Sequence, residues 1–400
     1  MSELKHTTRL IPLTNIEDGN VPIPSVEAYE NLMTFNESVK SRFTTSQGQR
    51  YNKIGALNLH PTVLPFDHNR IRLRNLIHGC DYVNANWISQ RADETASYDE
   101  VIYSSYLPSF KIKFAVCQDP IPATMHHHHR LIHENKFDFV ISFNKQEKEK
   151  PLKVGKTTNI NNMTLKILER KTITEHWTRT EMRLFDTVAP GAQYMHDIVH
   201  FEFNNWKTDE MTTYKDTMDL VKGMCLIRDE FKLERSSLKV LLHDPDGGIG
   251  GCAVFISLYE ILQQIDESFT DDNQLKRSAE GIDVSNIVNN LRKDKANMVN
   301  DYQTYKLLFL SMGYYGPNRV MLSNSHSKNS SAESASTCES GTAKIVVKRK
   351  NQPGQALGSD TPNDDGIEYV IHENSESDDG DPFDGYYDKN GILNKEYYNL

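Results

Sequence analysis

The chain lacks the features that mark disulfide-rich, membrane-spanning or nucleic-acid-binding proteins. Its 400 residues include five cysteines and no Cys-x-x-Cys pair, which argues against a disulfide framework and for a reducing compartment. No run approaches the roughly eighteen apolar residues of a membrane span, and the first residues form no apolar signal segment. The net charge of -10 argues against a general nucleic-acid binder. We therefore expect a soluble, cytoplasmic protein without direct membrane insertion.

Composition divides the chain into three parts. Residues 1–21 are polar, lie just before Pro22 and Pro24, and are expected to form a lead-in or linker. Residues 22–318 carry strand and helix patterns and are expected to form one folded domain. Residues 319–400 are first serine-rich and then acidic, and have too few aliphatic residues to offset their ordering entropy. We expect this tail to be disordered.

One stretch organises the rest of the chain. Residues 238–243 are rich in leucine and valine and predict an interior strand, and the glycines at 247, 248, 250 and 251 predict a tight loop. Apolar residues at helical spacing then predict a helix that starts near Cys252. A strand, a glycine-rich loop and a helix point a row of backbone N–H groups at one anion.

This layout, with His243 at the end of the strand, resembles the phosphate loop of the protein tyrosine phosphatase family. Further blocks match that family in the right order: Pro65, Asp67, His68 and Arg70, then residues 81–88, 114–124, 200–206 and 298–308. The resemblance covers roughly residues 22–316 and implies an α/β fold of the α+β type, with a highly twisted mixed sheet flanked by helices. It is strongest to the second, membrane-distal domain of receptor-type phosphatases, which is usually inactive. The chain is therefore expected to be cytoplasmic. The alternative is that it forms the intracellular part of a single-pass membrane receptor whose anchor lies outside this sequence.

The residues that carry the family's chemistry are replaced. The family has Cys, five residues and then Arg after the His, whereas Asp244 stands at the nucleophile position here and Gly250 at the arginine position. Thr208 stands where the general acid is expected, and threonine does not release a proton near neutral pH. A carboxylate about 4 Å from a phosphate repels it by roughly 4 kcal/mol at an effective dielectric constant near 20. We therefore expect no catalytic residue to be intact.

Two further parts of the expected pocket have changed. His60 replaces the aromatic residue that stacks on the substrate ring, and Asn300 and Thr304 replace the two glutamines that position water. The substrate-binding positions that remain, together with His60, are His243, Gly247 and Gly248. The resemblance therefore implies a degenerate substrate pocket.

The run of histidines at residues 126–129 invites a metal-binding interpretation, since His126 and His129 share a helix face. No Cys or carboxylate cluster with ligand spacing accompanies them. We interpret the run as a solvated first helical turn and expect no metal and no cofactor.

Three residues offer alternative catalytic groups. Asp244-Pro-Asp246-Gly-Gly imitates the Asp-x-Asp-Gly motif of magnesium-dependent phosphotransferases with an aspartate nucleophile, which need a further acidic pair. Asp271 and Asp272 are the Asp pair that follows within residues 22–318, and they lie in a polar stretch. Cys252 is not followed by an arginine at the required spacing. Asp209 lies one position after Thr208, and we interpret it as a surface carboxylate rather than as a shifted general acid.

The sequence therefore predicts a catalytically inactive phosphatase-like domain that acts as a protein-binding and regulatory module in tyrosine-phosphorylation signalling. An active tyrosine phosphatase with an atypical or upstream catalytic site remains the alternative, and an enzyme with Asp244 as nucleophile is a weaker one. Expected partners are proteins, such as a catalytic phosphatase domain or a tyrosine-phosphorylated signalling protein. Candidate phosphorylation sites in the tail are Tyr369, Tyr386, Tyr387, Tyr397 and Tyr398.

Overall fold

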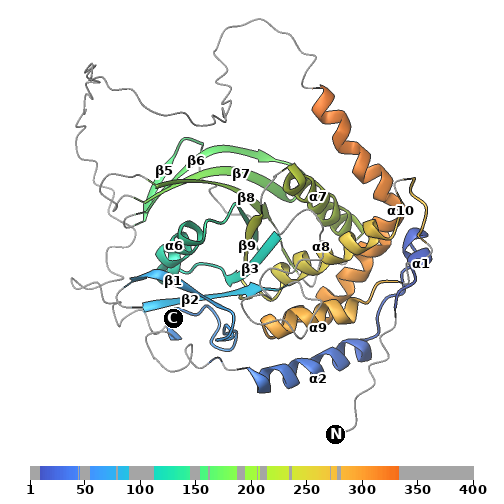
Figure 1. Ribbon diagram of the computed structural model, residues 1–400, viewed down its shortest axis with the longest axis horizontal. Helices are drawn as coiled ribbons and strands as arrows, with labels where there is room; N and C mark the ends of the chain where they lie inside the picture. The colour runs from blue at the N-terminus through green and yellow to red at the C-terminus, as the bar shows by residue number, and fades with distance from the viewer. Residues whose placement is uncertain are drawn as a thin grey trace, which may run out of the picture. The chain divides into compact units, whose positions relative to one another are not determined.

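Figure 1 shows the computed structural model of the chain. It describes residues 10–43, 45, 55–77, 80–89, 112–144, 154–160, 163–186, 194–204, 206–207, 214–233, 237–270, 272–276 and 281–332. Thr208, Asp209, Asp271 and the five tail tyrosines lie outside these ranges, so the expectations placed on them are not addressed by the structure.

A twisted sheet of nine strands forms the centre of the fold, in the spatial order β1-β2-β3-β9-β4-β8-β7-β6-β5. The strands are β1 (Arg70–Ile77), β2 (Cys80–Ile88), β3 (Ile112–Gln118), β4 (Phe139–Phe143), β5 (Thr157–Ile160), β6 (Met163–Thr172), β7 (Trp177–Asp186), β8 (Tyr194–Phe203) and β9 (Leu238–Asp244). Strand β9 lies between β3 and β4 and is parallel to both, and β4 is parallel to β8. The outer pairs are antiparallel. The expected mixed sheet with residues 238–243 in its interior is confirmed.

Helices cover both faces of the sheet (Figure 1). They are α1 (Leu13–Glu17), α2 (Val26–Arg42), α6 (Met125–Asn135), α7 (Tyr214–Leu233), α8 (Gly251–Glu267), α9 (Val284–Asp294) and α10 (Tyr302–Ala332), with a short 3-10 helix, η1 (Pro122–Thr124). Because side chains alternate along a strand, β9 sends Val240 and Leu242 into the large core with α8, and Leu241 into a second core with α6. The carboxyl end of β9 is therefore enclosed from both sides.

The first residue of α8, Gly251, lies in close contact with the sheet. A Cβ atom at Gly251 would lie 2.3 Å from the ring of Phe143 on β4, so glycine is required for this contact. The following residues Cys252, Ala253 and Val254 are all fully buried. This close approach holds the first turn of α8 against the end of β9.

The expected lead-in is partly packed into the core. Ile11, Leu13 and Ile16 are at most 4% exposed, and the backbone of Ile11 forms an antiparallel bridge with Ile282. The prediction of a linker over residues 1–21 is therefore wrong for residues 11–17. The sequence separation of about 270 residues from Ile282 hides this contact from local pattern analysis.

The other expected boundary, at residue 318, falls inside α10. Arg319 and Leu322 are 8% and 5% exposed, and the Arg319 guanidinium lies 3.4 Å from the ring centroid of Phe269. The packed part of the domain thus extends at least to Leu322. Among the described residues, no helix is both long and apolar enough to cross a bilayer.

Candidate functional site

The glycine-rich loop between β9 and α8 is filled by a side chain of the protein itself. The N–H groups of Asp246 and Gly248 donate to Oδ1 of Asp244 at 3.0 and 2.6 Å. Those of Gly250 and Cys252 donate to Oδ2 at 3.1 and 3.0 Å. Asp244 has no solvent exposure. The carboxylate therefore occupies the position that the loop geometry prepares for an anion.

The same carboxylate caps α8. Residue Gly250 at the N-cap position has no side chain to offer, so the first N–H groups of the helix need another acceptor. Asp244 supplies it from the end of β9, where its negative charge also lies at the positive end of the helix dipole. Asp244 thus stabilises the start of α8.

Opposing effects act on the protonation of this buried group. Burial raises the pKa of Asp244, the N–H groups of Cys252 and Gly248 lower it, and the nearby Asp246 carboxylate raises it; the net direction is upward. Burial and the neighbouring Asp244 also raise the pKa of the Cys252 thiol, which is hydrogen-bonded to Asp244. Cys252 is thus held as a thiol and is no thiolate nucleophile at neutral pH.

A buried lysine lies close to this group. Lys295 has no solvent exposure and donates to Oδ1 of Asn84 at 3.1 Å and to Oδ1 of Asn86 at 3.4 Å. Burial lowers its pKa to about 8, while the charge of Asp244 acts in the opposite direction. Nothing in the sequence pattern singled Lys295 out, because its partners lie about 210 residues away on β2.

The loop follows its path only with glycine at two positions. Gly247 and Gly248 have φ values of 83° and 85°, in the left-handed region that favours glycine. A Cβ at Gly247 would lie 2.8 Å from Cγ1 of Val63, and one at Gly248 would lie 3.0 Å from the carbonyl oxygen of Cys117. The loop therefore packs against the segment that contains Val63 at Gly247 and against the backbone of β3 at Gly248.

Substitution at Gly248 tests this close support. Gly248→Ala is expected to lower the free energy of unfolding by about 2 kcal/mol, because it combines an unfavourable φ with a backbone contact that cannot rotate away. The measurement is chemical denaturation of the variant beside Gly55→Ala. A Cβ at Gly55 meets nothing within 4 Å, so that change serves as the matched control. Equal stabilities of the two variants would contradict the assigned backbone geometry.

The Asp246 side chain lies at the position expected to hold a phosphate-binding arginine. A Cβ at Gly250 would lie 2.7 Å from Oδ2 of Asp246 and 3.4 Å from its Cβ. The Asp246 side chain therefore leans over the place from which an arginine would extend. An arginine at residue 250 requires Asp246 to move.

The remaining pocket positions have local partners. His60 is half-buried, and its Nε2 lies 2.7 Å from the carbonyl oxygen of Pro245, so the imidazole is fastened to the loop. Thr304 is buried at the start of α10, where its N–H donates to Asp301 Oδ1 at 2.7 Å and its Oγ1 accepts from Asp301 N–H at 3.2 Å. This reciprocal pair is a capping box, which uses Thr304 for helix initiation. Asn300 directly precedes Asp301, and Oδ1 of Asn300 is buried without a hydrogen-bond partner among the described residues.

Trp206 marks where the loop with the expected general acid begins. It is fully buried, its N–H donates to the carbonyl oxygen of Asn144 at 2.7 Å, and its ring packs against Phe143 and Phe203. The start of the loop is thus fixed to the sheet.

The histidine run is buried, which contradicts the expected solvated helical turn. His127, His128 and His129 on α6 are 7%, 8% and 8% exposed. The ring of His128 lies 4.9 Å from that of His243, and Nδ1 of His243 lies 2.6 Å from Oδ1 of Asp119. The prediction of a solvated turn failed because polar side chains are usually exposed. Here the histidines are surrounded by other imidazoles and a carboxylate, which lie on distant segments. The acidic residue Asp119, which directly follows β3, was the available signal.

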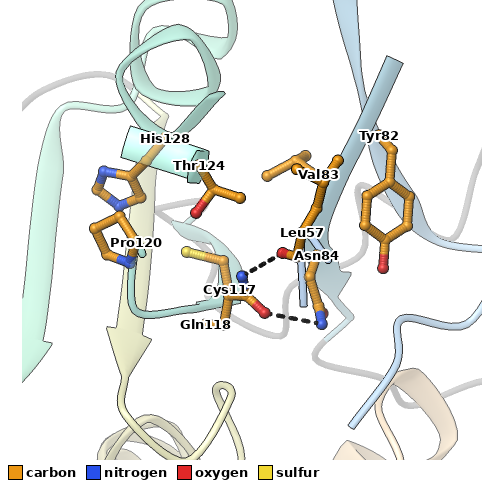
Figure 2. Close-up of a pocket in the computed structure, with 9 residues that line it drawn as sticks. All are labelled: Leu57, Tyr82, Val83, Asn84, Cys117, Gln118, Pro120, Thr124 and His128. Carbon is orange, nitrogen blue, oxygen red and sulfur yellow. Dashed lines mark hydrogen bonds between the residues drawn. The ribbon is translucent and has the colours of Figure 1, made fainter. Parts of the chain in front are cut away.

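Figure 2 shows the residues that line a small cavity between β2, the end of β3 and the start of α6. Its lining residues are Leu57, Tyr82, Val83, Asn84, Cys117, Gln118, Pro120, Thr124 and His128. Nε2 of Gln118 donates to the carbonyl oxygen of Leu57 at 2.7 Å, and Nδ2 of Asn84 donates to Oε1 of Gln118 at 3.3 Å (Figure 2). Its volume of about 10 Å³ has room for roughly one water molecule and none for a phosphoryl group.

The geometry also bears on an aspartate nucleophile at residue 244. Both oxygens of Asp244 accept two N–H groups each, and the side chain has no path to solvent. Within the described ranges, no group of three or more His, Cys, Asp or Glu side chains has the arrangement to hold a metal ion. An attack by Asp244 on a magnesium-bound phosphoryl group therefore finds no support in this arrangement.

The fold and the loop define the class: a mixed sheet in which an interior strand ends in a glycine-rich oxyanion cradle at a helix N-terminus, as in phosphatases. The family model described as protein-tyrosine phosphatase matches residues 56–312, more than half of the 400 residues. The chain belongs to the protein-tyrosine phosphatase family.

Two curated proteins of Drosophila melanogaster are similar to the chain at low identity. Tyrosine-protein phosphatase 69D is 21% identical over 296 residues, which cover 70% of this chain and 18% of that protein. Tyrosine-protein phosphatase non-receptor type 61F is 23% identical over 228 residues, which cover 55% of this chain and 37% of that protein. The chain thus matches well under half the length of either relative.

Proposed function

We propose that the chain is a catalytically inactive member of its family and acts as a protein-binding, regulatory module in tyrosine-phosphorylation signalling. The observation that carries this proposal is the seating of the Asp244 carboxylate on four N–H groups of the loop. These four donors are therefore already used by a side chain of the protein itself. A phosphotyrosine would have to displace a buried side chain and overcome its charge.

Loss of the chemical groups supports the same proposal. No thiol or thiolate stands at residue 244, Gly250 carries no guanidinium, and burial keeps Cys252 protonated. Since a guanidinium binds two phosphate oxygens at once, no other side chain substitutes for it. The best-matching role is that of the second domain of receptor-type phosphatases, and the alternative is an active enzyme with an atypical or upstream catalytic site.

Partners follow from the same role. We infer that the folded domain binds proteins, such as a catalytic phosphatase domain or a tyrosine-phosphorylated signalling protein, and that the tail contributes Tyr369, Tyr386, Tyr387, Tyr397 and Tyr398 as phosphorylation sites. Each phosphorylation adds roughly -1.5 to -2 charge units and creates acceptors for arginine clusters of a partner.

Hydrolysis assays test the proposal. We expect no release of phosphate from phosphotyrosine peptides or small aryl phosphates by the wild-type chain, with or without magnesium. Turnover that needs magnesium and disappears in Asp244→Asn would support the aspartate-nucleophile alternative instead. In parallel, capture of a phosphatase domain or a tyrosine-phosphorylated protein is compared for the full chain and a chain ending at Ala332; equal capture would assign binding to the folded domain alone.

A further inference from the structure

The histidine run has a structural environment that the proposed function does not use. His128 and His129 of α6 meet His243 of β9 and His200 of β8 between the helix and one face of the sheet; we call these four residues the histidine layer. Ring centroids are 4.9 Å apart for His128 and His243, 6.1 Å for His128 and His129, and 6.0 Å for His200 and His243. His128, His129 and His243 are 5–8% exposed.

Sheet register and helix position bring these rings together. Ser142 of β4 is paired with His243 of β9, and its Oγ lies 2.9 Å from Nε2 of His200 on β8. Helix α6 covers this face and places His128 perpendicular to the ring of His243, at 80°. The layer therefore joins one helix to three adjacent parallel strands.

The charges around the layer come from every element packed on it. The segment after β3 supplies Asp119, whose Oδ1 lies 2.6 Å from Nδ1 of His243, and β3 itself supplies the neutral thiol of Cys117. Arg130 and Glu134 on α6 form an ion pair at 2.6 Å, and Arg170 on β6 and Glu202 on β8 form another at 3.0 Å. His126 lies close enough to lower the pKa of His129, and the buried Lys295 interacts with Cys117 and Asp244. On β9, Asp244 directs its carboxylate to the loop. Asp119 is thus the carboxylate in contact with the layer, and its single charge offsets at most one positive charge on the four rings.

Helix α6 is poorly suited to hold that charge. Its first turn contains histidines but no acidic residue, and its N-cap Thr124 makes no side-chain capping bond. Cations near a helix N-terminus oppose the helix dipole. Burial already lowers the pKa of His129 to about 4, from an ordinary value near 6.5. Between about pH 6.5 and pH 4, the imidazole of His129 binds a proton when α6 is unfolded but not when α6 is packed on the sheet. Acidification therefore favours release of α6.

We propose that the histidine layer is an acid-sensitive latch, in which proton uptake by the buried imidazoles releases the N-terminal half of α6 from the sheet while β9 and α8 remain folded. The latch borders the filled loop, since His243 directly precedes Asp244 and the N–H of Asp119 donates to the carbonyl oxygen of Asp244 at 2.9 Å. This inference is independent of whether the chain hydrolyses phosphate.

Hydrogen exchange of the full chain tests the latch. After correction for the pH dependence of chemical exchange, amides of residues 125–135 are expected to lose at least tenfold more protection than those of residues 238–258 between pH 7.5 and pH 5.5. His128→Phe/His129→Phe should remove most of this difference. His176→Phe is the matched control, because His176 directly precedes β7, lies 3.9 Å from Asp216 and is not part of the layer; this variant should behave as the wild type.

His200→Gln provides a second variant in case the double substitution does not fold. Glutamine keeps a hydrogen-bonding group near Ser142 but cannot be protonated, so the midpoint of the α6 transition should move at least 0.3 pH units lower. Protection of residues 125–135 that is independent of pH would overturn the latch. Simultaneous loss of protection in α6 and β9, or an unchanged midpoint in every folded layer variant, would overturn it as well.

Discussion

Asp244→Ala is expected to lower the free energy of unfolding by about 4 kcal/mol. The substitution leaves four inward-facing N–H groups without their acceptor, and an unsatisfied buried donor costs roughly 1–3 kcal/mol. The total is smaller than the sum of four such terms, because the variant no longer desolvates a carboxylate and water can enter the vacated space. The first turn of α8 also loses its cap.

Chemical denaturation of Asp244→Ala and Asp246→Ala measures this effect. Asp246 is the neighbouring acid in the same loop, is only half-buried, and raises the pKa of Asp244. Its replacement is expected to change stability by less than about 1 kcal/mol. Asp244→Asn should resemble the alanine variant, since its amide group turns a donor toward two of the N–H groups. A fully stable Asp244→Ala protein would show that the carboxylate does not hold the loop.

Asp244→Cys is expected to yield no phosphatase activity above the wild-type background. The change supplies a thiol, but residue 250 still provides no guanidinium, and activity depends on groups that act as a unit. Asp244→Cys/Gly250→Arg should also remain inactive, because the Cβ atom of the new arginine would lie 2.7 Å from Oδ2 of Asp246. Rates are measured with a small aryl phosphate, under single-turnover conditions, beside an active family member.

A graded series separates the causes. Adding Asp246→Ala to the double variant removes the side chain that an arginine at residue 250 would meet, and phosphate binding should become tighter than in the double variant. Turnover should stay absent, since Thr208 stands at the position expected for the general acid. Robust turnover by Asp244→Cys alone would mean that the loop assignment is wrong.

Strand β9, the glycine loop and the start of α8 were predictable from local patterns. The leucine-rich run, the spacing of glycines and the helical period each point to one structure, and α8 begins one residue before the expected Cys252. The presence of an anion at the loop also followed from Asp244 in the sequence. That its carboxylate turns back to bind four N–H groups did not follow, because side-chain direction depends on the closed loop.

Contacts between distant segments account for the failed predictions. Ile11 pairs with Ile282, and His128 packs on His243, so apolar or polar character within a short window gave the wrong environment. Lys295 is a further example, since its acceptors Asn84 and Asn86 lie on another strand. These residues are placed by the topology of the sheet and not by their own neighbours in sequence.

The most direct measurement of the central claim is the response of the thermal midpoint to an oxyanion. Wild type and Asp244→Ala are heated in tungstate or phosphate and in sodium chloride of equal ionic strength. With the cradle filled by Asp244, the wild-type midpoint should be the same in both salts, whereas the emptied cradle of the variant should gain about 2.7 kcal/mol at an anion concentration 100 times its Kd. A saturable rise of the wild-type midpoint with oxyanion, or with a phosphotyrosine peptide, would contradict the account, because it would show that the loop is open to phosphate.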